Sequence, residues 1–231
     1  YYALLHLWTS ITRSADPEVV RAMSVLVGVS AIPAIAWLAH TLFARPPVAV
    51  LAALLLAFSP FHIYYSQEVR MYGLALLLSI VSTGLFWRLI LRIDRKEPVR
   101  WAVGFYAISG ILSLLTLYYL AFLLIAHLLW ATWHYRSTLR KVVPILVGDS
   151  LIALGNLAWW VFAIPRLIPY ISDKVLADKD APLAVGPYLS RHILAFLAGT
   201  VSSSSVPVSV LTYIGLAGMT MALIAAWFPR T

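Results

Sequence analysis

The sequence has no cysteine and little charge. None of its 231 residues is a cysteine, which excludes disulfides, thiolate metal ligands and cysteine nucleophiles and leaves the redox compartment open. Charged residues make up only 11% of the chain, whereas 62% of it is hydrophobic. A water-facing surface needs more charge than this. Together with a mean hydropathy of +0.88, the composition predicts an integral membrane protein.

Several chemical motifs are absent as well. The sequence has no glycine-rich phosphate loop, no nucleophile elbow and no paired zinc-ligand motif. Its six histidines are not spaced as metal ligands, and most of them are predicted to lie at the membrane interface. The residues therefore predict no metal site, and chemistry by a soluble nucleotide-binding domain is not expected.

Apolar stretches of spanning length dominate the chain, since a helix needs roughly 20 apolar residues to cross a bilayer. The region 101–133 is divided in two, because one helix of that length would be about 50 Å long and would exceed the hydrocarbon core. We expect an all-α polytopic transmembrane helical bundle of about seven spans in a single domain, with an interfacial helix at 1–12 and an exterior loop at 171–205. The predicted spans are 19–43, 48–65, 71–91, 101–115, 116–133, 142–164 and 206–228.

Basic residues fall mainly on one side of this topology. That side carries ten basic residues against Asp94 and Glu97, whereas the other carries seven basic residues against six acidic ones. The positive-inside rule makes the first side cytoplasmic and predicts a multi-pass protein of the cell membrane. The net charge of +8 follows from this asymmetry, so nucleic-acid binding is not expected. The ten residues are Arg45, Arg88, Arg92, Arg95, Lys96, Arg100, Arg136, Arg140, Lys141 and Arg230.

The segment 59–72, with the sequence SPFHIYYSQEVRMY, is the strongest candidate site. It places Glu68 and Arg70 at the junction of two apolar stretches, on the predicted exterior side. A charged group at membrane depth costs several kcal/mol unless it is paired or solvated, so such residues are functional candidates by default. The alternative is a water-exposed loop whose aromatic residues form only an interfacial belt.

Local spacing gives this segment a predicted shape. Pro60 should end or kink the second span, after which a short helical stretch can continue into the third. On that helix Tyr64, Glu68 and Tyr72 would share one face. Arg70 would point elsewhere, which argues against a local ion pair with Glu68 and favours a separate partner for each.

Asp149 is a second polar feature, well inside the span 142–164, with Asn156 two turns further along the same face. A charged residue at that depth can mark a functional site. The other interpretation is that Asp149 accepts hydrogen bonds from a neighbouring helix, and the lack of a basic residue at its depth favours it.

The segment 59–72, followed by an apolar span, resembles the bacterial and archaeal relatives of dolichyl-phosphate-mannose protein mannosyltransferases, within the GT-C superfamily of membrane glycosyltransferases. The opening YYALLHLW, the segment PEVVRAMS and the neighbourhood of Thr116 and Tyr118 fit the same pattern in order. The resemblance covers mainly 1–133. It implies transfer of a sugar from a polyprenyl-phosphate carrier to a protein, lipid or glycan acceptor on the exterior face, and leaves the cofactor open, a divalent metal included.

By position, the resemblance implies roles for individual residues. Glu68 would be a catalytic residue that helps to bind the acceptor or a metal. Arg70 would hold the lipid phosphate, for which a guanidinium offers a bidentate fork. The remaining substrate-binding candidates are His62, Tyr65, Gln67 and Tyr72.

Two departures from the family pattern affect these expectations. The family's catalytic base is an acidic residue of the first exterior loop, which precedes the YY segment, so the chain is expected to be a fragment that is inactive alone. At a later turn, family members often have His before Tyr, whereas this chain has Leu117 before Tyr118. Two rival functions remain. One is a lipid or sugar transporter that uses Asp149 and Asn156, although no inverted repeat is visible in the sequence. The other is a scaffold that binds a lipid carrier without catalysis.

Overall fold

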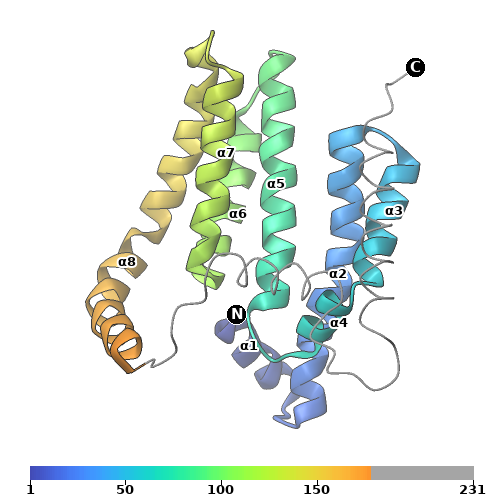
Figure 1. Cartoon of the computed structure of the whole chain (residues 1–231), viewed down its shortest axis with the longest axis vertical. Helices are drawn as coiled ribbons and strands as arrows, with labels where there is room; N and C mark the ends of the chain where they lie inside the picture. The colour runs from blue at the N-terminus through green and yellow to red at the C-terminus, as the bar shows by residue number, and fades with distance from the viewer. Residues whose placement is uncertain (178–231) are drawn as a thin grey trace.

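The computed structural model describes residues 1–177, and every regular element within them is helical. The long helices run up and down a bundle (Figure 1). This confirms the predicted all-α class. In chain order the elements are α1 (Tyr2–Thr12), α2 (Pro17–Phe43), α3 (Pro46–Ala57), α4 (Pro60–Gln67), α5 (Tyr72–Asp94), α6 (Arg100–Thr116), the 3-10 turn η1 (Tyr118–Leu120), α7 (Ala121–His134), the 3-10 turn η2 (Leu139–Val142) and α8 (Val143–Ala177).

Three helical segments of the described chain are long and apolar enough to cross a membrane. They are α2, α5 and the segment Leu139–Tyr170, and the pair α3 and α4 makes a fourth if it is counted as one bent span. Helix α6 is apolar but shorter. The predicted membrane character is therefore confirmed, whereas the predicted span 206–228 lies outside the described residues.

Two predicted chain breaks are confirmed. Helices α3 and α4 meet at 58°, with Pro60 in the first turn of α4, where its missing N–H costs nothing. The Ser59 side chain caps α4 by accepting a hydrogen bond from the His62 N–H at 3.3 Å. In the region 101–133, α6 ends at Thr116 and α7 returns antiparallel to it (Figure 1).

The end of α8 differs from the prediction. The helix continues to Ala177, so residues 171–177, which were expected to begin the exterior loop, are helical. It passes through Pro165 and Pro169 on the way. A proline removes one backbone hydrogen bond and bends a helix without necessarily ending it. The rest of the predicted loop lies outside the described residues.

The main core lies between α5, α6, α7 and α8. A smaller apolar cluster, Ala31, Leu38 and Ile80, joins α2 to α5. Small residues allow close helix contacts, as is typical of membrane bundles: a Cβ on Gly84 would overlap the Trp37 ring, and one on Gly110 would overlap the Ile152 side chain.

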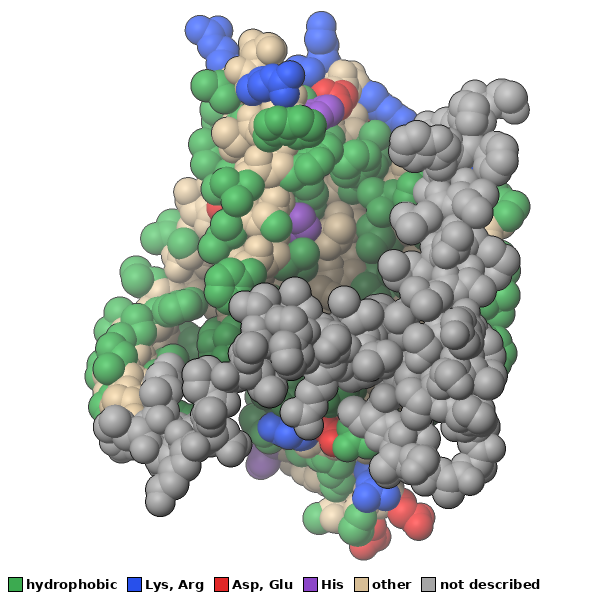
Figure 2. Space-filling view, viewed as in Figure 1, with side chains coloured by type: hydrophobic (Ala, Val, Ile, Leu, Met, Phe, Trp, Pro, Cys, Tyr) green, Lys and Arg blue, Asp and Glu red, His purple; other side chains and the backbone are tan. Residues whose placement is uncertain are grey.

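The described loops alternate between the two ends of the bundle. The connections α2–α3, α5–α6 and α7–α8 lie toward one end, which we call the basic end, and α1, α4 and the α6–α7 turn lie toward the other (Figure 1). Lys and Arg side chains gather at the basic end (Figure 2). Within residues 1–177 the loops therefore fall at the two ends as predicted, and the cytoplasmic location of the basic end stays a prediction.

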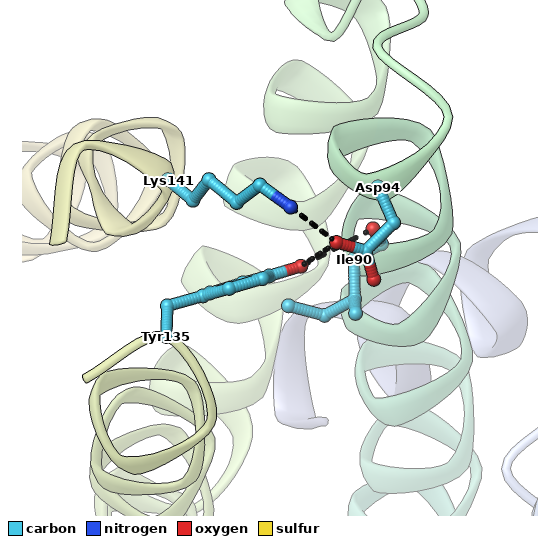
Figure 3. Close-up of polar contacts among 4 residues, drawn as sticks. All are labelled: Ile90, Asp94, Tyr135 and Lys141. Carbon is cyan, nitrogen blue, oxygen red and sulfur yellow. Dashed lines mark hydrogen bonds and ion pairs between the residues drawn. The ribbon is translucent and has the colours of Figure 1, made fainter. Parts of the chain in front are cut away.

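A polar cluster ties the α7–α8 connection to α5 at the basic end (Figure 3). The Asp94 Oδ1 atom accepts a hydrogen bond from Lys141 Nζ at 2.9 Å and another from the Tyr135 hydroxyl at 3.1 Å. Burial, and then the bond to Asp94, raises the pKa of Tyr135 above its ordinary value. The phenol therefore stays protonated and remains a donor throughout the physiological range. We call these three residues the clamp.

Candidate functional site

The candidate segment forms a short helix followed by a turn. Helix α4 ends at Gln67, Glu68 has an extended backbone with ψ 135°, and α5 begins at Tyr72. The prediction that one helix carries Tyr64, Glu68 and Tyr72 is therefore wrong. Both α4 and α5 pack against α2, and because the chain changes direction between them it cannot stay helical (Figure 1).

Helix α4 is fixed to α2 by a close contact. Ser66 is buried against Gly28, where any Cβ would overlap its hydroxyl, and Ser66 Oγ donates to the His62 carbonyl at 2.7 Å. The His62 ring is also buried and lies against the Gly28 backbone. His62 thus faces the helix contact rather than solvent, and its position suits it to holding α4 in place.

Arg70 lies in an aromatic group formed across the turn. Its guanidinium carbon is 4.9 Å from the centre of the Tyr72 ring, and the Tyr72 and Tyr65 rings meet edge to face at 5.0 Å. Arg70 itself is exposed. Within residues 1–177 it makes no ion pair with a carboxylate, so its forked donors can bind an anion from outside.

Glu68 lies in the same turn, beside the Tyr64 side chain. Its Oε2 atom is buried and has no hydrogen-bond partner among the described residues. A buried carboxylate oxygen without a donor is costly, so this atom is suited to accept a hydrogen bond from a bound group. The structure confirms that Glu68 and Arg70 do not pair with each other. Gln67 is exposed at the end of α4.

The described residues do not form a metal centre of their own. In the part of the chain covered by 1–177, no group of three or more His, Asp or Glu side chains is placed to hold a metal ion. A metal bound at Glu68 would need ligands from elsewhere.

Asp149 takes part in helix packing. The Tyr106 hydroxyl, on α6, donates to Asp149 Oδ1 at 3.0 Å, so the predicted hydrogen bond from a neighbouring helix is confirmed. Asn156 is fully buried, and its amide donates to the Ile152 carbonyl at 2.8 Å. One oxygen of each, Asp149 Oδ2 and Asn156 Oδ1, has no partner among the described residues.

Sequence reasoning missed polar contacts inside the bundle. His127, on α7, is buried rather than interfacial, and its Nε2 lies 3.2 Å from the Thr83 hydroxyl on α5. Because that hydroxyl donates its only hydrogen to the Ser79 carbonyl, it must accept from the imidazole N–H. These partners are more than forty residues apart in sequence, and the spacing within one helix gives no signal for them.

No protein-family profile matches this chain, and no curated protein or solved structure is detectably similar to it. The GT-C resemblance therefore stays a prediction based on the quoted motifs.

Proposed function

We propose that the protein acts as a membrane glycosyltransferase that takes a sugar from a polyprenyl-phosphate carrier, with the carrier phosphate bound by Arg70. The observation that carries the proposal is the exposed guanidinium held on Tyr72, in a turn between two apolar helices, without a carboxylate partner in the described chain. A carrier phosphate would reach Arg70 where these apolar helices end, and a guanidinium stabilises the charge that develops as the phosphate leaves.

Glu68 complements this assignment. Its unpartnered Oε2 atom lies in the same turn as Arg70, where it can accept the hydrogen of an acceptor hydroxyl or amine. Glu68 and Arg70 would then serve the two substrates separately, one contacting the acceptor and the other the donor. Tyr65, Tyr72 and Gln67 would line the space between them.

The proposal includes a topology. It keeps the predicted number of about seven spans, with α6 and α7 among them, the basic end in the cytoplasm and the site at the exterior face of the cell membrane. Helix α1 would lie in the interface, because Leu4, Leu7 and Ile11 share one exposed face. The helix is attached to α2 through the Trp8 indole, which donates to the Val19 carbonyl at 2.8 Å.

The test is Arg70→Ala in the full-length protein, assayed in membranes for transfer from polyprenyl-phosphate sugars. We expect a loss on the order of a hundredfold, with partial rescue in Arg70→Lys because the fork is lost but the charge remains. Arg166→Ala is the matched control, since Arg166 also lies over an aromatic ring, Phe162, at 4.8 Å. Near-normal turnover in Arg70→Ala at matched expression would reduce Arg70 to an interfacial anchor.

A lipid or sugar transporter is the second candidate. The unpartnered oxygens of Asp149 and Asn156, between helices of the bundle, are the observation in its favour. In that case Asp149→Asn would abolish transport, whereas Arg70→Ala would leave it largely intact.

A further inference from the structure

The basic end has more positive charge than its own acidic groups can pair. Within residues 1–177 the ion pairs there are Lys141 with Asp94, at 2.9 Å, and Arg95 with Glu97, at 3.9 Å. Both acidic residues at this end are thus engaged. Arg136 and Arg140, in the connection between α7 and α8, are exposed and have no acidic partner in the described chain.

Exposed apolar residues lie beside these two arginines in the chain. The Arg136 guanidinium lies 5.4 Å from the centre of the Trp133 ring, and that indole is 65% exposed. Leu139, between the two arginines in sequence, is 60% exposed, and Val143 continues the exposed apolar surface along α8. Cations at the level where apolar helices end, with an indole beside them, are typical of the membrane interface.

The connection itself is held in one position. Backbone hydrogen bonds from Thr138 N to the Tyr135 carbonyl, at 2.7 Å, and from Lys141 N to the Thr138 carbonyl, at 2.9 Å, close its turns. The clamp attaches Tyr135 and Lys141 to α5 (Figure 3). Because Lys141 is already engaged, the two arginines are the groups that this rigid connection presents outward.

We propose that Arg136 and Arg140 form a binding site for the headgroup of an anionic phospholipid, whose acyl chains lie along the exposed apolar surface of Trp133, Leu139 and Val143. A phosphodiester matches the guanidinium fork. Its negative charge complements the basic end, where both described carboxylates are already paired. An acidic soluble protein or a nucleic acid would match the charge alone and would leave the adjoining apolar surface without a partner. This site is independent of the proposed transfer reaction, which is placed at the opposite end.

The proposal is tested by reconstituting the full chain in nanodiscs of phosphatidylcholine with about one phosphatidylglycerol in five lipids, then extracting it in mild detergent. Native mass spectrometry counts the lipids that stay bound. In the parent we expect the ratio of bound phosphatidylglycerol to bound phosphatidylcholine to exceed their ratio in the nanodisc by about tenfold. Each basic group near an anionic lipid surface contributes favourably to binding. Arg136→Gln with Arg140→Gln should lose most of this preference, and each single variant should lose part of it.

The matched control removes two charges at the other end, by Arg13→Gln with Arg166→Gln, and should keep the preference. Equal retention of phosphatidylglycerol in the parent and in Arg136→Gln with Arg140→Gln, at the same thermal midpoint, would overturn the proposal. An equal loss in the control would also overturn it, because the preference would then reflect bulk charge. If the double variant does not fold, the single variants decide the question, and unchanged retention in both rejects the site.

Discussion

The charged residues at the two ends of the bundle differ in their partners. At the basic end, Asp94 binds Lys141 and Tyr135, so a carboxylate joins α5 to the connection between α7 and α8. At the other end, Glu68 has an oxygen without a donor and Arg70 lies on an aromatic ring instead of a carboxylate. The acidic residues of the basic end have basic partners within the described chain, whereas Glu68 and Arg70 form no ion pair there and are available to a ligand.

The largest expected difference between the two ends is that they lie on opposite sides of the membrane. Since the chain has no cysteine, Lys96→Cys and Gln67→Cys can be labelled in intact cells with an impermeant thiol reagent. We expect labelling of position 67 and none of position 96 until the membrane is permeabilised. Gln67 is a better probe than its neighbour Ser66, which is buried against α2. Labelling of position 96 alone would reverse the assignment.

Removing the charge of Glu68 tests the ligand-facing end directly. Glu68→Gln is nearly isosteric and leaves Arg70 untouched, so the fold and carrier binding should persist. Sugar transfer should fall by on the order of a hundredfold, because a charged group at the reacting centre is neutralised. The comparison variant is Asp149→Asn, whose side chain has an internal partner in Tyr106. Normal transfer in Glu68→Gln together with lost function in Asp149→Asn would favour the transporter.

A smaller effect is expected from displacing α4. A Cβ at Gly28 would overlap Ser66, so Gly28→Ala should shift α4 and cost about 1–3 kcal/mol of stability, with a loss of transfer activity. Ser66→Gly in the same protein should restore much of both. Gly104→Ala is the control, since a Cβ there meets nothing within 4 Å. A Gly28→Ala protein as stable and active as the control would mean that the contact does not position the turn.

The sequence predicts breaks that follow from a proline or from helix length. The kink at Pro60 follows from the proline ring, which disfavours helical backbone at the preceding residue, and Ser59 is accordingly extended. The break after Thr116 follows from the length that a single helix would have against the bilayer thickness. The turn at Glu68 contains no proline, and helix length does not fix where the chain turns. It arises because α4 and α5 both pack on α2. Contacts between separate helices cannot be predicted from the residues of the turn alone.

Long-range partners show the same limit. A donor for Asp149 could be predicted because a buried carboxylate needs one, but the sequence did not identify Tyr106, 43 residues away. Asp94 is similar. It is one of two acidic residues among many cations, which indicates that it is paired, yet only the helix arrangement selects Lys141 and Tyr135 as its partners.

The smallest expected effects concern the clamp, and they test how far its charge pair stabilises the basic end. Lys141 and Asp94 have side chains 36% and 41% exposed, so their attraction is screened by water and Lys141→Met should cost at most about 0.5 kcal/mol. Tyr135 is buried, and its hydroxyl bond to Asp94 is only partly open to solvent. Tyr135→Phe removes that bond and should cost about 1 kcal/mol.

Thermal unfolding of the two variants in the same detergent, at low and high salt, gives the comparison. We expect salt to weaken the parent and Tyr135→Phe slightly and to leave Lys141→Met unchanged. If Lys141→Met is instead the more destabilised variant, the basic end is held by its ion pair, and the buried phenol contributes only packing.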